Sequence, residues 1–236
     1  MNLPFFYLEA IDLLAEIIYL NEETSKHIVQ VLRMARDEEL RLTDGKGNNY
    51  VTVIVDDYRK KCGVKIISKS FIARSSAVKV IAISLVKNNT RFEWFLEKAA
   101  EIGVSEIIPL LCTRTEKQQF RLERMKGILI SAMLQSKQSW LPEIKQPQKF
   151  LAYIAGCTVI QKFIAHCEEG KEKLLLRNAV KEGDNSSIVL IGPEGDFSKE
   201  EIAAAVNSNF IPVSLGTTRL RTETAGIVAA VILCSI

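Results

Sequence analysis

The pattern of apolar and polar positions divides the chain into two parts with different rhythms. Over residues 1–72, short runs rich in β-branched and aromatic residues are separated by turn formers, as in the segment 44–48, Asp-Gly-Lys-Gly-Asn. The expected strands are residues 4–8, 39–43, 50–55 and 64–67. Residues 23–34 instead have apolar side chains at helical spacing. Several short strands and one helix predict a small β-barrel domain over residues 1–72.

From residue 77 onward, strand and helix patterns alternate. The expected strands are residues 78–86, 106–111, 158–165, 187–191 and 211–215. The expected helices are residues 90–102, 121–137, 198–207 and 222–233. Near-continuous apolar strands that alternate with helices predict a parallel sheet covered on both faces, so the fold class of residues 77–236 is α/β.

Three sequence features predict where individual helices begin or end. Thr90 with Glu93, and Ser198 with Glu201, have the spacing of a capping box, and Gly103 has the place of a C-cap. The last helix is apolar on all sides from Ala225 to Leu233, which predicts a buried helix or an oligomer interface.

Composition restricts the class of protein. The chain has 236 residues, of which 47% are hydrophobic and 25% charged, and these values are typical of globular proteins. The most apolar run, residues 225–234, is too short to span a bilayer, and the N-terminus has no secretory signal pattern. The five cysteines form no C-x-x-C pair, which favours reduced thiols over a disulfide framework or zinc site. We therefore expect a cytoplasmic protein with neither membrane contact nor bound metal.

The formal net charge of +3 conceals a local excess. Residues 113–150 have 8 basic and 3 acidic side chains, a net charge of +5, whereas residues 1–75 and 76–112 are each neutral and residues 151–236 carry −2. A basic stretch of this kind either contacts phosphates or forms an ordinary solvated face. Charge alone leaves both interpretations open.

Two strand-to-helix turns are candidates for a ligand site. In the first, an apolar strand meets Gly192-Pro193-Glu194-Gly195 before a capped helix, and ligands bind beyond such strand ends in open α/β sheets. It matches neither a dinucleotide fingerprint nor a Walker sequence, and a plain tight turn is the alternative. In the second, Gly216 precedes a polar turn in which Arg221 and Glu223 could pair with each other, or merely belong to a capped helix start.

Four ordered motifs resemble the bacterial 16S ribosomal RNA (uracil-N3)-methyltransferases of the SPOUT superfamily. They are residues 92–104 (FEWFLEKAAEIGV), Gln135-Ser136 with Pro142, residues 192–195 (GPEG) and residues 220–225 (LRTETA). In the N-terminal part, residues 27–34 (HIVQVLRM) and the turn at residues 42–45 (LTDG) match the PUA-like barrel of this family. The chain departs from the family where Asp196 replaces a second glycine, where Arg219 precedes Leu220, and where Leu134 precedes Gln135.

The resemblance implies a PUA-like β-barrel at residues 1–72 and a SPOUT methyltransferase domain with a deep trefoil knot at residues 77–236. It also implies a homodimer and S-adenosyl-L-methionine as the cofactor. The residues expected to bind this cofactor are Ala165, His166, Ile191, Gly192, Pro193, Glu194, Gly195, Leu215, Gly216, Leu220 and Ala225.

The implied activity is methylation of N3 of one uridine in 16S rRNA within the 30S subunit. We hypothesise that Arg221 stabilises negative charge on the uracil carbonyls or anchors a phosphate, and that Glu223 orients Arg221 or accepts the proton. The residues expected to contact RNA phosphates are Arg33, Arg36, Arg114, Arg121 and Arg124. The alternatives are a noncatalytic RNA-binding assembly factor and a 2′-O-ribose methyltransferase of the same superfamily.

Overall fold

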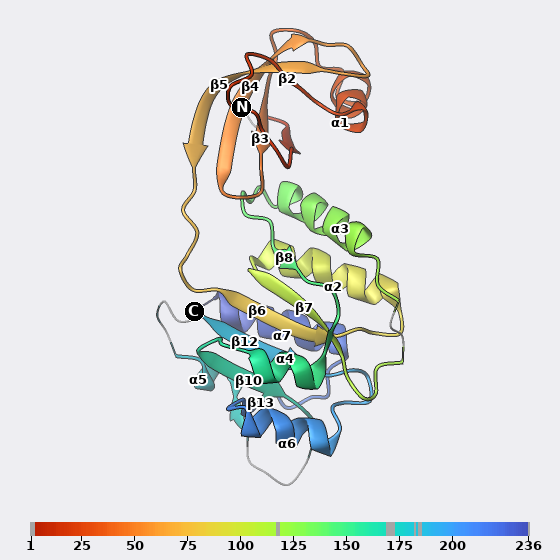
Figure 1. Cartoon of the computed structure of the whole chain (residues 1–236), viewed down its shortest axis with the longest axis vertical. Coiled ribbons are helices and arrows are strands. Elements are labelled where there is room, and N and C mark those ends of the chain that lie inside the picture. The colour runs from red at the N-terminus through yellow and green to blue at the C-terminus, as the bar shows by residue number, and fades with distance from the viewer. Residues whose placement is uncertain (1–2, 117–118, 169–172, 182, 184–185, 236) are drawn as a thin grey trace. The chain divides into compact units, whose positions relative to one another are not determined.

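The computed structural model describes residues 3–116, 119–168, 173–181, 183 and 186–235. The chain divides into two compact units (Figure 1). The N-terminal unit contains residues 3–74 together with 133–141, and the C-terminal unit contains residues 75–132 and 142–235. The segment 133–141, which the sequence places inside the domain 77–236, therefore packs with the N-terminal unit.

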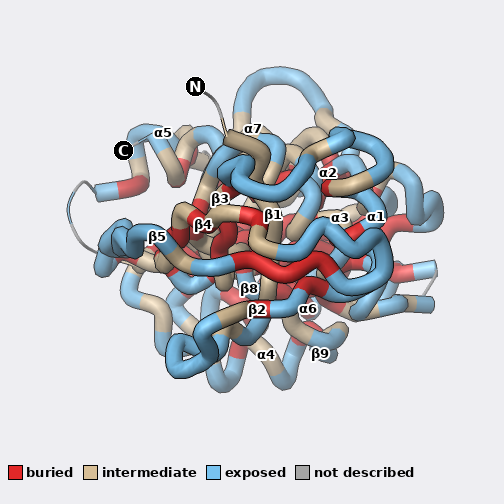
Figure 2. Tube along the Cα trace, turned by 90° about the horizontal axis from the view of Figure 1, so that it is seen from above, coloured by how far each residue is buried: buried red, intermediate tan, exposed pale blue. Residues whose placement is uncertain are grey.

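The N-terminal unit is built on a five-stranded sheet with the order β1-β3-β4-β5-β2. Its strands are β1 (Phe5–Tyr7), β2 (Ile18–Tyr19), β3 (Glu39–Thr43), β4 (Asn48–Asp56) and β5 (Gly63–Phe71). Buried positions run along β3 and β4 (Figure 2). Their side chains join Ile28 in a core that excludes water from one side of the sheet.

The helix of this unit is shorter than the sequence predicts. α1 spans Glu22–Lys26, and His27–Val31 forms a wider π turn in which Leu32 N donates to the His27 carbonyl at 2.9 Å. Arg33 then has a φ of 56°, a left-handed conformation that ends the helical path. The predicted helix over residues 23–34 is therefore confirmed as far as Val31, with a change from α to π geometry at His27, and is wrong only in its last residues.

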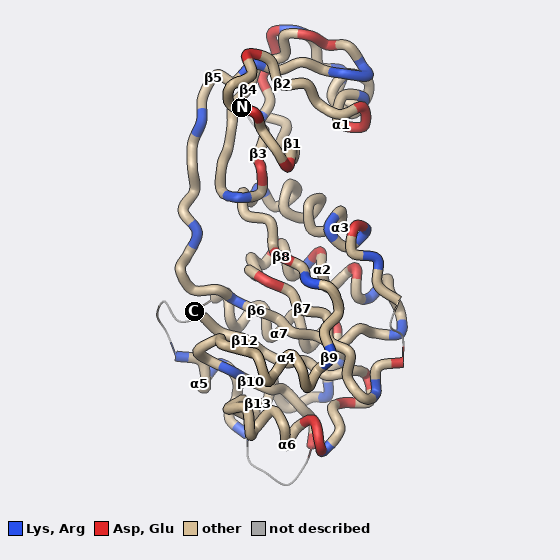
Figure 3. The backbone as a smooth tube through the Cα atoms, in the orientation of Figure 1, with Lys and Arg blue, Asp and Glu red and all other residues tan. Residues whose placement is uncertain are grey.

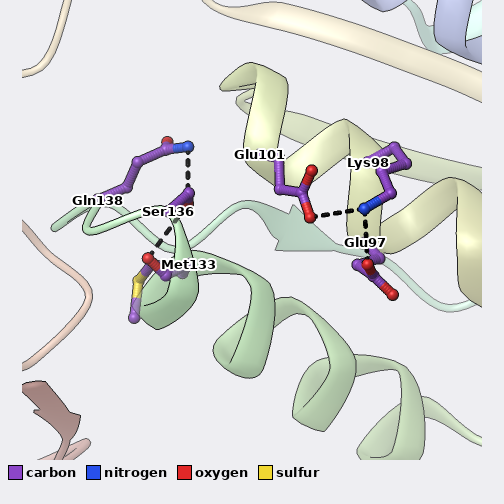
Figure 4. Close-up of polar contacts among 6 residues, drawn as sticks. All are labelled: Glu97, Lys98, Glu101, Met133, Ser136 and Gln138. Atoms are coloured by element: carbon purple, nitrogen blue, oxygen red, sulfur yellow. Dashed lines mark hydrogen bonds and ion pairs between the residues drawn. The ribbon is translucent and has the colours of Figure 1, made fainter.

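Segment 133–141 is fixed to the turn between β3 and β4. Gly47 N donates to the Ser139 carbonyl and Leu141 N donates to the Gly45 carbonyl, both at 2.8 Å. The Ser139 hydroxyl also lies 2.8 Å from the side-chain oxygen of Asn49. The segment itself turns at Ser136, whose hydroxyl donates to the Met133 carbonyl (Figure 4).

The C-terminal unit contains an eight-stranded sheet in which every pair of strands is parallel. The order is β11-β13-β10-β12-β6-β7-β8, and β9 also pairs with β7. The strands are β6 (Lys79–Ser84), β7 (Glu106–Leu111), β8 (Glu143–Ile144), β9 (Gln148–Lys149), β10 (Gln161–Ala165), β11 (Leu174–Leu175), β12 (Ser187–Ile191) and β13 (Ile211–Ser214). The predicted parallel sheet is confirmed.

Helices cover both faces of this sheet, as predicted. The helices are α2 (Asn89–Ile102), α3 (Leu122–Gln135), α4 (Phe150–Gly156), α5 (Leu176–Ala179), α6 (Lys199–Asn207) and α7 (Thr222–Cys234). Val80 and Ala82 of β6 belong to the core beneath α4 and α6, whereas Ile83 lies against Gly226 of α7. Because successive side chains of a strand leave opposite faces, α7 lies on the other face of the sheet.

Two of the three predicted helix ends are confirmed. Gly103 ends α2 with a φ of 96°, and Ser198 with Glu201 forms the complete capping box of α6. The capping box at Thr90 is wrong, because Asn88 is the N-cap of α2 and its side chain accepts from Thr90 N. Asparagine is a stronger N-cap than threonine, and Glu93 is engaged by Arg124 of α3.

The strand order brings the end of the chain back across the sheet. β13 lies outside β10, yet α7, which follows it, packs against β6, β12 and α2. The connection from β13 to α7 therefore crosses the position of β10 to reach β12 and β6. The predicted trefoil knot requires that the end of the chain thread a loop, and it stays a prediction.

Candidate functional site

A cavity lies where parallel strands of the C-terminal unit end together. Ala165, the last residue of β10, pairs in register with Ile191, the last residue of β12, and with Val213 of β13. The loops that follow these strands, together with the start of α7, enclose about 340 Å³. This volume is within the range of small-molecule sites. The lining residues are Arg91, Ala165, Cys167, Ile191, Gly192, Pro193, Glu194, Asp196, Arg219, Leu220, Arg221, Thr222 and Ala225.

The cavity brings together most, but not all, of the expected site residues. Arg221 lines it, as do seven of the expected cofactor residues: Ala165, Ile191, Gly192, Pro193, Glu194, Leu220 and Ala225. Five expected residues are not among the lining residues: the cofactor candidates His166, Gly195, Leu215 and Gly216, and the catalytic candidate Glu223. Sequence reasoning missed Arg91, Cys167, Asp196, Arg219 and Thr222. Four of these lie next to expected loops, but Arg91 comes from α2 and only the tertiary structure reveals it.

The glycine turn after β12 has little free space. A Cβ atom on Gly192 would lie 3.1 Å from both the side chain and the backbone N of Phe197, so Phe197 would have to move slightly to accept a side chain there. Arg114 supports the other end of the turn, donating to the Gly195 carbonyl at 2.5 Å and to the Phe197 carbonyl at 3.3 Å. The loop is therefore shaped by its own packing.

Asp196 joins two of the loops that enclose the cavity. Its φ is 64°, a left-handed conformation that glycine adopts at less cost. Its carboxylate accepts from Cys167 N at 2.7 Å and from Phe197 N at 2.8 Å. Cys167 follows β10 and Asp196 follows β12, so one side chain holds the loops after two neighbouring strands.

Three arginines and one buried glutamate determine the charge at the start of α7. Glu223 is buried, and its Oε1 lies 3.7 Å from Nε of Arg91. Arg219 and Arg221 are exposed, and neither guanidinium makes a hydrogen bond or ion pair with any residue that the structure describes. The pairing of Arg221 with Glu223 that the sequence suggests is thus replaced by a pairing of Arg91 with Glu223.

The five arginines expected to contact RNA differ in their surroundings. Arg33 and Arg36 are exposed in the N-terminal unit, and Arg121 is exposed in the C-terminal unit. Arg124 instead donates to both carboxylate oxygens of Glu93, at 2.5 and 2.9 Å, and this contact lowers the pKa of Glu93. Arg114 supports the glycine turn, so two of the five already have partners in the protein.

The thiols differ in exposure. Burial raises the pKa of Cys62 to about 11, of Cys112 to about 12 and of Cys234 to about 11. Cys167 is exposed and lines the cavity. Since the thiolate is the reactive form, the raised pKa values make Cys62, Cys112 and Cys234 poor nucleophiles at neutral pH.

Among the described residues, no helix is long and apolar enough to cross a membrane.

Comparison with known proteins identifies two family models. Residues 74–234 match the model of the RNA methyltransferase domain, and residues 20–67 match that of the RNA methyltransferase PUA domain. A probable rRNA-methyltransferase of Porphyromonas gingivalis is 35% identical in sequence, with a TM-score of 0.90, over 99% of this chain and 100% of its own.

Two further relatives carry names that concern the cofactor and the substrate. A methyltransferase of Legionella pneumophila in complex with the bound cofactor SAM is 28% identical, with a TM-score of 0.87, over 100% of this chain and 98% of its own. The ribosomal RNA small subunit methyltransferase E of Buchnera aphidicola is 26% identical over 97% of this chain and 91% of its own length.

Proposed function

The chain belongs to the RNA methyltransferase family, and from this premise we propose that it methylates N3 of a specific uridine in 16S rRNA within the 30S subunit. The cavity beyond β10, β12 and β13 carries the proposal, because it combines a glycine turn with Arg219 and Arg221, whose guanidinium groups have no partner among the described residues. Relatives named as small-subunit rRNA methyltransferases support the substrate. A ribosomal substrate supports action in the cytoplasm.

The lining of the cavity fits S-adenosylmethionine. This cofactor has an apolar adenine face, a cationic sulfonium and an amino acid end with both charges. The cavity offers apolar surface from Ile191 and Leu220, carboxylates from Glu194 and Asp196, and the guanidinium of Arg219. The Legionella structure with bound SAM, which aligns with the whole chain, supports this assignment. When bound, S-adenosylmethionine supplies the methyl group.

The residues around the cavity have separate tasks in this proposal. Uridine N3 carries a proton and becomes nucleophilic as the proton leaves, so negative charge develops on the uracil carbonyls. Arg221 lies at the cavity, and because no residue in the described part of the chain pairs with its guanidinium, this group can stabilise that charge or hold a phosphate. The buried Glu223 keeps Arg91 at the cavity wall through their ion pair, so we assign Glu223 a positioning role.

A homodimer is part of the proposal. The buried face of α7 packs inside the C-terminal unit, whereas Val231 is 45% exposed and Ile227 and Val228 are partly exposed. An exposed apolar stripe on a helix favours contact with another protein surface. A second copy of this chain, joined through the outer face of α7, is the partner that we propose.

The decisive experiment is methyl transfer from labelled S-adenosylmethionine to 30S subunits that lack the modification, followed by nucleoside analysis. We expect 3-methyluridine. Recovery of a 2′-O-methyl nucleoside would favour the 2′-O-ribose activity, and stable 30S binding without transfer would favour the noncatalytic assembly factor.

Arg221→Ala tests the assigned role within the same assay. We expect a loss of roughly 10²-fold or more in kcat, because a group that stabilises developing charge is removed. Lys199→Ala, an exposed cation on α6 outside the cavity, serves as the control with unchanged kcat. Full methylation by Arg221→Ala would refute the role of this residue.

A further inference from the structure

The N-terminal unit carries a cluster of aromatic and basic side chains, and none of them lines the cavity. Three pieces of chain form it: the turn before β4, the end of β5 with the residues after it, and segment 133–141. The Phe71 and Trp140 rings meet edge to face with centroids 6.1 Å apart. The Arg74 guanidinium lies 5.3 Å from the centre of the Trp140 ring.

Trp140 is held in a fixed position. Its Nε1 donates to the Ile72 carbonyl at 2.8 Å, and its ring lies so close to Gly47 that a Cβ atom there would be 2.6 Å from it. Ile72 N in turn donates to the Gly47 carbonyl at 2.9 Å. The Trp140 ring is therefore preorganised by backbone contacts, which reduces the entropy lost on binding.

Two apolar residues of the cluster are exposed, and Trp140 is partly exposed. Phe71 is 60% and Ile72 is 50% exposed, and the strand alternation places Lys69 on the same face of β5 as Phe71. Basic positions mark β5 and the stretch after it (Figure 3). The turn before β4 adds Lys46, and its Asp44 carboxylate is engaged in three hydrogen bonds within that turn.

Exposed aromatic rings flanked by cations are the features by which proteins hold unpaired nucleotides, because bases stack on the rings and phosphates approach the cations. We propose that Phe71, Arg74 and Trp140 form a stacking surface for an unpaired base of single-stranded RNA, with Lys46 and Lys69 beside it for phosphates. This inference rests on the proposed function, since it assigns part of the RNA contact to the N-terminal unit.

The first test measures the affinity of the full chain for unmodified 30S subunits at several salt concentrations. Phe71→Ala should weaken binding roughly tenfold and leave the salt dependence unchanged, because stacking releases no counterions. Arg74→Gln should weaken binding and also reduce the salt slope. Tyr58→Ala is the matched control, because Tyr58 is 55% exposed in the same unit but stands beside Asp56 and Asp57.

The second test uses fluorescence and does not depend on the stability of a Phe71 variant. The chain has two tryptophans, so Trp94→Phe leaves Trp140 as the single reporter. A uridine hexanucleotide should quench its emission, whereas the same phosphate backbone with abasic sites should quench it far less.

The two proposals fail in different ways. The stacking surface would be wrong if Phe71→Ala bound 30S subunits with the affinity of the unmodified chain, or if both oligonucleotides quenched the emission equally. Neither result would contradict methylation by the unmodified chain. Absence of methylation by the unmodified chain would instead overturn the proposed function.

Discussion

At the scale of single residues, Asp196 shows what a departure from a family pattern means physically. The family often has glycine at this position, and the structure explains the preference by a φ of 64°. The aspartate accepts this conformation and adds hydrogen bonds from Cys167 N and Phe197 N. The sequence reveals the departure, but neither the backbone angle nor the partner from another loop.

Asp196→Ala should therefore destabilise the protein by about 2 kcal/mol, because the strain remains while two hydrogen bonds disappear. Asp196→Gly should cost less, since relief of the strain offsets part of that effect. Urea unfolding of both variants measures the difference. If Asp196→Ala were as stable as Asp196→Gly, or more stable, this explanation of the role of Asp196 would be wrong.

Cys167 should report on cofactor binding. At pH 8 iodoacetamide should label Cys167 first. The other three thiols, Cys62, Cys112 and Cys234, have raised pKa values and therefore contain little thiolate at that pH. Saturating S-adenosylmethionine should slow the labelling of Cys167, which lines the cavity.

Mass spectrometry of the labelled peptides gives the readout, and Cys167→Ser should abolish the rapid phase. Labelling of Cys167 at an unchanged rate with S-adenosylmethionine present would count against binding in this cavity.

At the scale of elements, the α2 and α7 pair shows how the C-terminal unit closes over its sheet. Gly226 sits inside α7, where a Cβ atom would lie 2.7 Å from the Phe95 ring and 2.9 Å from Ile83 Cδ1. α2 and α7 approach this closely because the residue between them has no side chain. On α2 the partly exposed Lys98 ammonium donates to the carboxylates of Glu97 and Glu101 (Figure 4).

Gly226→Ala should lower the free energy of unfolding by about 1–3 kcal/mol, because the added methyl group forces packed rings and strands apart. Gly127→Ala is the matched control, a helical glycine of α3 with no atom within 4 Å of the added Cβ. The control should be neutral or more stable by up to about 1 kcal/mol. Equal effects of the two substitutions would contradict the close approach.

Elements with a strong local pattern could be predicted from the sequence. β3 and β12 have the predicted bounds, because their apolar runs end at clear turn or polar residues. The two-residue strands β2, β8, β9 and β11 and the short helices α4 and α5 were missed, since tertiary contacts and not a local pattern determine such short elements. Most residues that line the cavity lie in loops next to the sequence motifs, so their place in the site could be predicted. Arg91 could not be predicted, because it reaches the cavity from α2.

At the scale of the whole molecule, the basic stretch 113–150 is not one structural region. It contributes residues to both units, and its Arg114 and Arg124 have partners within the protein. The net charge of a sequence segment therefore shows where cations lie along the chain. It does not show which of them remain available to bind a phosphate. The exposed Arg33, Arg36 and Arg121 are the better candidates.

Changing Arg33, Arg36 and Arg121 together to glutamine should weaken 30S binding and reduce the slope of log affinity against log salt by roughly one for each phosphate that is no longer neutralised. Arg124→Gln should change the slope less, because Glu93 already neutralises that cation. Filter binding across a salt series measures both. An unchanged slope in the triple variant would exclude these three residues from the phosphate-binding surface.

The hydrogen bonds that tie segment 133–141 to the turn before β4 have a consequence for biosynthesis. The N-terminal unit lacks a part of itself until Ser139 and Leu141 have been translated and have left the ribosome. A nascent chain of residues 1–74 therefore emerges with its β-turn unpaired, and this unit completes its folding only after more than half of the protein has been made. Separate expression of residues 1–74 should reproduce this incomplete state.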